Sequence, residues 1–470
     1  MKCFNKIFNL SIGIRSGLML MPLWLGLNLL YSCKKDWLDE KPRASIVVPV
    51  SLADLQAILD NSALMNGTQG GSTPNAGEMS ADNYYMTYND FLTRTEIEQN
   101  TYIWQKEIYA GSTSFDWNKS YQQIYNSNIV LEGLQKLSNS DRLTSTYNTV
   151  KGSALFYRAY AFFNLAQIYC SPYNPATTNT GYGLPLRLTS DPNEILTRST
   201  LLQTYDRIID DLTQATELLP EIVPYKTRPG KAAAFAALAR VYLSMSNFEN
   251  ALVYSGKALA ISNFLLDFNT LTLTAAYPVA RFNNEVVFNS VLNGSLIWNT
   301  YGRVDNQLFQ SYASNDLRQS AYFRTNTDGT KAFKGSYYGS QLLFSGLSNG
   351  ELYLTSAECK ARKGLYVEAL ADLNKLLVKR WKNGTFVPIT ASNSNDALII
   401  ILNERRKELV FRGLRWTDLR RLNQDPNFQT TLVRILGTQQ YSLVPNDPRY
   451  VLPIPDDVIA ANPSLPQNIR

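Results

Sequence analysis

Histidine is absent from all 470 residues of the chain. This absence excludes nucleophilic catalysis by Ser-His or Cys-His pairs, metal sites built from imidazole, and the side chain that most often serves as a general base near neutral pH. Enzymes that work with carboxylates alone are not excluded, and glycoside hydrolases are the main class among them. A carboxylate-only glycoside hydrolase therefore remains an alternative to a protein that only binds its ligand.

Cysteine is scarce as well, with four residues in the chain. Cys3 lies in the leader segment described below and Cys33 directly follows that segment, which leaves Cys170 and Cys359 for the folded body. These two could pair, but two cysteines in so long a chain are no disulfide framework. We expect them to be buried free thiols.

Charged residues are also sparse, because Asp, Glu, Lys and Arg together make up 18% of the chain. Residues 1–32 carry three basic residues and no acidic one, so without them 42 basic and 39 acidic residues give a formal net charge of +3. No cluster of Lys and Arg marks a nucleic-acid surface, and we expect no nucleic-acid partner. With aromatics at 12%, the composition indicates a folded body rather than disorder.

The start of the chain predicts a secretory signal peptide over residues 1–32. Three basic residues precede an apolar run over residues 18–31, which is shorter than the about 20 apolar residues that a bilayer-spanning helix needs. Pro22 interrupts this run, and charged residues follow it at once. We therefore expect a leader that is removed rather than a permanent membrane span.

The end of this leader resembles the lipobox of bacterial lipoproteins. Leu30 stands three residues before Cys33, and Ser32 directly precedes it. The resemblance implies that Cys33 becomes the lipidated first residue of the mature chain, followed by a lipid-anchored tether over residues 33–50. The alternative is a plain signal peptide with an incidental cysteine.

Helical periodicity dominates the rest of the chain and predicts a mainly α fold. The spacing of apolar residues predicts a helix capped by Ser51 and further helices over residues 117–134, 154–169 and 201–219. We expect one domain over residues 51–470, with an N-terminal part over 51–263, an irregular insertion over 264–350 and a C-terminal part over 351–470.

An internal repeat indicates how these helices pair. Two pairs of alanines stand twelve residues apart, each with an aromatic residue three positions before the second alanine: Ala239, Phe248 and Ala251, and Ala357, Tyr366 and Ala369. Small residues at these points let two antiparallel helices touch, which resembles the tetratricopeptide repeat. Ala166 and Ala215 are candidates for a third pair, and unrelated alanine-rich hairpins are the alternative.

Two long segments, residues 67–116 and 264–350, interrupt the helical pattern. Both are rich in aromatic residues, and the second contains one predicted strand over residues 286–288. Long irregular segments in a compact domain are more often functional than not. We expect these segments to present the ligand-binding groups.

The C-terminal part carries the most specific pattern. Residues 404–409 read ERRKEL and residues 413–421 read GLRWTDLRR, followed by YVLPIP at 450–455 and by NP and QN near the end. This order resembles the signature of RagB/SusD-type nutrient-uptake lipoproteins. Residues 33–39, 117–128 and 158–165 resemble the mature start and early helices of that family, so the resemblance spans the mature chain.

This resemblance implies an outer-membrane lipoprotein that faces the cell exterior and captures oligomeric nutrients, usually glycans. The implied fold is a SusD-like α/α superhelix whose repeat face docks on a SusC-like TonB-dependent transporter, with partly β insertions as the binding face. The ligand could also be a peptide or another oligomer, since a fold does not encode its cargo. A pure scaffold role is a further alternative.

We predict the ligand-binding residues from their positions in the two irregular segments. The candidates are Asn83, Tyr84, Tyr85, Tyr102, Trp104, Trp298 and Tyr301. Aromatic rings offer flat apolar faces to sugar rings, and amides beside them can bond hydroxyls. Packing of each residue within its own loop is the alternative. The sequence assigns no catalytic residue, no metal ligand and no cofactor.

The carboxylates of the C-terminal part favour structural roles. Glu404, Arg405, Arg406 and Glu408 are spaced to form ion pairs with one another or with neighbouring helices. Glu351 and Glu358 lie seven residues apart and could be imagined as a glycosidase pair, but Glu358 falls inside the repeat motif. Packing explains it better than catalysis.

Overall fold

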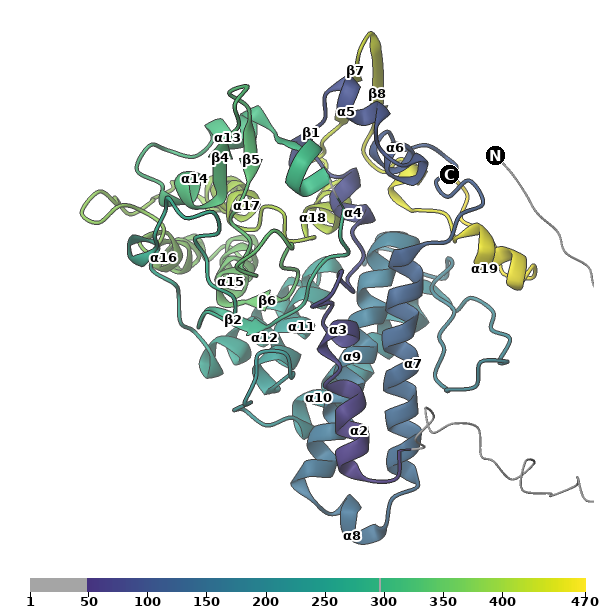
Figure 1. Ribbon diagram of the computed structural model, residues 1–470. Coiled ribbons are helices and arrows are strands. Elements are labelled where there is room, and N and C mark those ends of the chain that lie inside the picture. The colour runs from purple at the N-terminus through teal and green to yellow at the C-terminus, as the bar shows by residue number, and fades with distance from the viewer. Residues whose placement is uncertain (1–48, 296) are drawn as a thin grey trace, which may run out of the picture. The chain divides into compact units, whose positions relative to one another are not determined.

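The computed structural model in Figure 1 describes residues 49–295 and 297–470, except for the side chains of Trp298 and Asn299. The predicted signal peptide, the lipidation site Cys33 and nearly all of the tether lie outside the described residues. Residues 50–470 form one compact unit. Across the described ranges, no helix combines the length and the hydropathy that a membrane span requires.

Three long helices and one shorter helix pack against one another and build the N-terminal part of this unit (Figure 1). They are α2 (Leu52–Leu59), α7 (Phe115–Gln135), α9 (Ser145–Tyr169) and α10 (Leu201–Leu218). The cap predicted at Ser51 is confirmed and is part of a capping box, since its hydroxyl accepts the N–H of Asp54 and the Asp54 carboxylate accepts the N–H of Ser51. The three helices predicted after it are confirmed as α7, α9 and α10.

The predicted repeat pairs are confirmed by four further helices: α11 (Lys231–Ser244) with α12 (Phe248–Ile261), and α15 (Asn349–Arg362) with α16 (Tyr366–Leu377). Ala239, Ala251, Ala357 and Ala369 are all at most 1% exposed. Because α12 also packs on α15 and α15 on α17 (Ser394–Glu408), the pairs form one helical scaffold.

The irregular segments contain short helices: α4 (Ala76–Ser80), α5 (Tyr88–Leu92), α6 (Glu96–Tyr102), α13 (Asn306–Gln310) and α14 (Leu317–Tyr322), with a 3-10 turn over Phe268–Thr270 and a π-helical turn over Ile297–Tyr301. Elsewhere lie α3 (Ser62–Met65), α8 (Asn139–Arg142), α18 (Arg415–Leu422) and α19 (Asp456–Ala461), and a single 3-10 turn over Pro448–Tyr450.

Four antiparallel strand pairs complete the described fold: β1 (Tyr84–Tyr85) with β3 (Arg303–Val304), β2 (Val286–Phe288) with β6 (Leu347–Ser348), β4 (Phe323–Thr325) with β5 (Lys331–Phe333), and β7 (Leu432–Leu436) with β8 (Gln439–Leu443). The strand predicted over 286–288 is confirmed as β2. The β1–β3 pair joins the two irregular segments, with Tyr84 opposite Val304.

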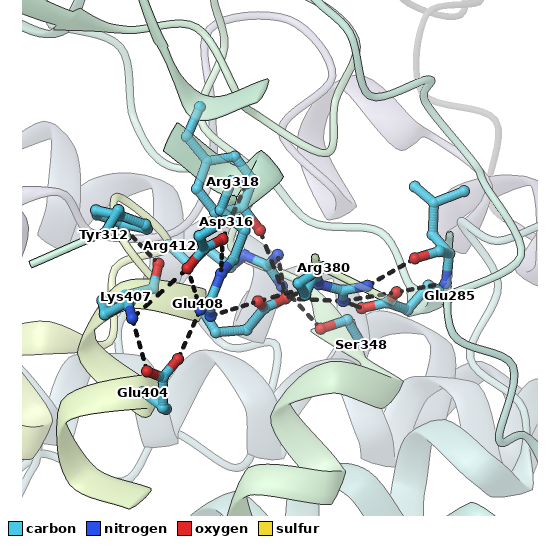
Figure 2. A network of polar contacts seen from close by, with 12 residues as sticks. Glu285, Tyr312, Asp316, Arg318, Ser348, Arg380, Glu404, Lys407, Glu408 and Arg412 are labelled. Atoms are coloured by element: carbon cyan, nitrogen blue, oxygen red, sulfur yellow. Dashed lines mark hydrogen bonds and ion pairs between the residues drawn. The ribbon is translucent and has the colours of Figure 1, made fainter. Parts of the chain in front are cut away.

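A buried network of charges ties the insertion to the C-terminal helices (Figure 2). Arg380 bonds Glu285 at 2.9 Å and Glu408 at 2.8 Å, and Arg318 reaches Glu408 at 3.2 Å and Glu404 at 2.6 Å. Burial raises the pKa of Glu408, but the charges of Arg380 and Arg318 outweigh it and lower the pKa overall. The ion pairs predicted for Glu404 and Glu408 are therefore confirmed as structural.

The two remaining cysteines are free and buried, as predicted. Burial raises the pKa of the Cys170 thiol to about 11 and that of Cys359 to about 12. Both thiols therefore stay protonated and unreactive near neutral pH.

Candidate functional site

The two irregular segments meet through their backbones. Ser72 and Thr73 donate their N–H groups to the carbonyl of Val291 at 3.0 Å, and Gly294 donates to Gly70 at 3.0 Å. Gly71 has a φ of +90°, and a Cβ there would lie 2.1 Å from the carbonyl oxygen of Leu292. Only glycine permits so close an approach of the two segments.

A pocket of about 880 Å³ opens where these segments reach the start of α7. Its apolar lining comes from Ala76, Met79, Ile97, Ile108, Phe115 and Leu452, and its polar lining includes Gln69, Asn293 and Ser295. The Phe115 side chain is 74% exposed. This size and mixture suit a small oligomer with both apolar and hydroxyl-rich faces.

Asp116, in the first turn of α7, holds the base of the pocket together. Its carboxylate accepts the N–H of Asn75 at 3.0 Å, the N–H of Ala76 at 2.9 Å and the amide of Asn293 at 2.6 Å. Within the described ranges it has no ion pair, and burial raises its pKa although these hydrogen bonds oppose the shift. Asp116 is thus a positioning residue that joins both segments to α7.

Helix α6 contributes a second wall. Thr95 caps it together with Glu98, whose other oxygen accepts the hydroxyl of Ser295 at 2.6 Å. Glu96 is exposed and has no hydrogen bond or ion pair with any described residue. Thr101 is 1% exposed, and its buried hydroxyl finds no partner in the part of the chain that the structure describes. A buried polar group without a partner costs stability, which a bound ligand can recover.

Four of the predicted ligand-binding residues pack inside the protein instead of lining this pocket. Asn83, Tyr84, Tyr102 and Trp104 are at most 2% exposed. The Trp104 indole donates to the carbonyl of Ser80 at 3.0 Å, and the guanidinium of Arg434 lies 3.6 Å from the centre of the Tyr102 ring. In this arrangement they support the loops, which was the alternative stated for each of them.

The other predicted residues lie nearer the surface. Tyr85 and Tyr301 are half-buried, and the guanidinium of Arg94 lies 3.4 Å from the centre of the Tyr301 ring. The side chain of Trp298 lies outside the described residues. Tyr301 belongs to the turn that follows Ser295, a lining residue of the pocket.

Phe115, Asp116 and Thr101 were not among the residues predicted from the sequence to bind the ligand. The only signal for Phe115 and Asp116 is their place at the boundary between the irregular segment and the helix predicted from residue 117. Thr101 is an ordinary helical residue, and no sequence pattern marks its unpartnered hydroxyl.

The imagined glycosidase pair is engaged in buried ion pairs. Glu351 bonds Arg240 at 2.6 Å, and Glu358 bonds Arg421 at 2.5 Å. Glu351 is 4% exposed and Glu358 is fully buried. These carboxylates stabilise helix packing, as the sequence favoured, and neither lines the pocket between the irregular segments.

A second cavity of about 460 Å³ lies between α17 and the base of the β7–β8 hairpin. Arg415 bonds Asp82 there at 2.7 Å, and Arg406 reaches Asp82 at 3.2 Å. Burial raises the pKa of Asp82, but both guanidiniums outweigh it and lower the pKa far below its usual value. The ion pair predicted for Arg406 is therefore confirmed, as is that of Arg405, which bonds Asp418 at 2.9 Å.

Glu78 in α4 makes stability depend on pH. Burial raises its pKa to about 7, although the Asn83 amide and the Gly413 N–H donate to its carboxylate. Its stabilising contribution is therefore fully present below about pH 4.5, the unfolded value, and is lost as pH rises through about 7. Relative to Glu78→Gln, the wild type should lose on the order of 3 kcal/mol between pH 4.5 and 8. Urea unfolding of both proteins across this pH range measures the difference between their free energies of unfolding. A difference that does not change with pH would refute the prediction.

Comparisons with known proteins agree with this architecture. A family described as "Starch-binding associating with outer membrane" matches residues 36–243, and the SusD family matches residues 349–470. SusD-like protein P2 of Formosa agariphila is 28% identical over 144 residues, which cover 30% of this chain and 26% of that protein. The alignment thus spans about a quarter of the length of this relative.

Solved structures match over nearly the whole chain. A SusD superfamily protein from Bacteroides thetaiotaomicron gives a TM-score of 0.73 at 20% identity, covering 90% of this chain and 100% of that one. A SusD-like carbohydrate binding protein from Bacteroides vulgatus gives a TM-score of 0.67 at 20% identity, and the match covers 88% of this chain and 97% of that one. At these identities the likeness shows the fold alone.

Proposed function

The chain belongs to the SusD/RagB family, and from this we propose that it is a lipid-anchored outer-membrane protein that binds an oligomeric nutrient, a glycan in the first place. In this proposal, residues 1–32 are the signal peptide, Cys33 is lipidated, and residues 33–50 tether the domain over 51–470 at the cell exterior. The protein binds its ligand without turning it over.

The pocket between the two irregular segments is the observation that carries the proposal. It combines an apolar lining, the exposed ring of Phe115 and hydroxyl and amide groups, which together fit the faces and edges of sugar rings. Tyr301, backed by Arg94, is a half-buried ring in the turn that follows the lining residue Ser295. The starch-binding description of the family that matches residues 36–243 supports a glycan over a peptide.

Delivery to a SusC-like TonB-dependent transporter is part of the same proposal. Stacked helix pairs offer a broad and rigid docking surface. Apolar side chains around α16 remain exposed, with Val367 at 65% and Val378 at 46%. In this proposal the scaffold docks on the transporter through the face that carries these side chains.

Calorimetric titration of the chain from residue 34 onward with neutral oligosaccharides and with peptides tests the proposal. Phe115→Ala should weaken glycan binding about tenfold, because a stacked ring contributes about 1 kcal/mol or more beyond its buried area. Tyr125→Ala, which removes another exposed ring of α7 outside the pocket, should leave the affinity unchanged.

Three outcomes would contradict this proposal in different ways. Saturable binding of peptides but not of glycans would favour the peptide alternative. Release of shortened products would revive the carboxylate-only hydrolase. If Tyr125→Ala and Phe115→Ala lowered the glycan affinity equally, the pocket would not be the binding site.

A further inference from the structure

The charged side chains that line the pocket are unevenly divided between the two signs. Glu96, Glu98 and Asp116 bring three carboxylates, and Lys119 is the only basic residue among the described lining residues. The whole chain has the opposite balance, with 45 basic and 39 acidic residues. The pocket therefore concentrates negative charge on a protein that is positive overall.

Neighbouring cations cancel this excess only in part, since Arg94 forms an ion pair with Glu98 alone among the three carboxylates. Asp116 is bonded by neutral donors, and Glu96 has no partner among the described residues. The nearest arginine in the sequence, Arg94, does not line the pocket: its guanidinium lies against the Tyr301 ring and comes within 3.9 Å of Glu98. A ligand in the pocket would therefore meet a net negative field in a partly desolvated site, where charges interact more strongly than in water.

The unpartnered hydroxyl of Thr101 is a separate sign that the site is completed by a polar ligand. It is buried at the pocket wall, and within residues 49–295 and 297–470 nothing bonds it. A hydroxyl can donate to or accept from a sugar hydroxyl, or accept from an amine.

We propose that this pocket selects neutral or amine-bearing glycans and rejects polyanionic ones, such as oligouronates and sulfated chains. The proposal rests on the glycan-binding function proposed above and narrows it to a chemical class. Repulsion by like charges at a binding site discriminates between partners more effectively than it sets absolute affinity.

Charge-selective labelling of an engineered cysteine measures the field without knowledge of the natural ligand. Ser112 lines the pocket and is exposed, and both cysteines of the described chain are buried. The measured quantity is the labelling rate of a methanethiosulfonate with a quaternary ammonium divided by that of one with a sulfonate. In Ser112→Cys this ratio should be about fivefold or more higher than in Ser145→Cys, whose cysteine is at an exposed position outside the pocket.

Adding Glu96→Gln to Ser112→Cys should reduce this rate ratio about twofold, and high salt should reduce it further. The matched control Glu221→Gln removes an exposed carboxylate elsewhere and should leave the ratio unchanged. A ratio equal to that of Ser145→Cys, or one that Glu96→Gln does not change, would overturn the proposal.

Maltohexaose and its C6-oxidised uronate then connect the field to ligand choice. The uronate should bind at least about tenfold more weakly at low salt, and Glu96→Gln should narrow this gap. If the uronate binds as tightly as maltohexaose, the proposed selection against polyanionic glycans is wrong, whereas the proposed glycan binding is supported. A biased labelling ratio with no binding of any oligosaccharide would instead refute the glycan function and retain the charged pocket.

Discussion

Replacing Arg380 by methionine should lower the free energy of unfolding by about 3–5 kcal/mol, because it leaves the buried Glu285 without a cation and removes one of the cations paired with the buried Glu408. Arg380 is fully buried, bonds Glu285 and Glu408, and also donates to the carbonyl of Leu266 at 2.6 Å. Methionine fills much of the same volume, so the loss reports the unpaired charges rather than a cavity. Chemical denaturation measures it.

The neighbouring residue offers a matched control. Lys379 pairs with Asp267 at 3.2 Å, but its side chain is 44% exposed, so Lys379→Met should cost less than about 1 kcal/mol. Glu285→Gln should cost less in the Arg380→Met background than in the wild type, because its partner is already gone. Equal losses from Arg380→Met and Lys379→Met would mean that the network in Figure 2 contributes nothing beyond surface pairing.

The sequence predicted one side of this network and not the other. The spacing of Glu404, Arg405 and Glu408 on one helix indicates ion pairs, and they are present. Arg318 and Arg380, the partners of Glu404 and Glu408, come from segments 28 or more residues away, which no local pattern connects to α17. Local periodicity fixes helices and their apolar faces, whereas partners across the fold depend on tertiary packing.

In the candidate site, too, the sequence predicted the segments involved but not the contacts between distant residues. The two irregular segments were predicted to carry it, and both line one pocket. Which aromatic residue faces the ligand could not be predicted, since Tyr102 and Phe115 stand in similar polar surroundings in the sequence. Burial is decided by contacts such as the stacking of Arg434 on Tyr102, and Arg434 lies more than 300 residues further along the chain.

Trp104 and Phe115 allow this division between support and contact to be tested directly. Trp104→Ala should lower the free energy of unfolding by about 3–5 kcal/mol, because it removes a ring that is 2% exposed and leaves a cavity in its place. It also removes the indole hydrogen bond to Ser80 and the ring beside Arg434. At temperatures well below unfolding, its glycan affinity should stay within about threefold of the wild type, because the ring does not line the pocket.

Phe115→Ala should give the opposite pair of results. Its ring is 74% exposed, so the free energy of unfolding should change by less than about 0.5 kcal/mol while glycan affinity falls about tenfold. Denaturation and calorimetry on both variants separate the two roles, since each variant changes one quantity and leaves the other. Unchanged stability with abolished binding in Trp104→Ala would show that the loop around Trp104 opens to expose this ring to the ligand, and that the buried cluster itself belongs to the binding site.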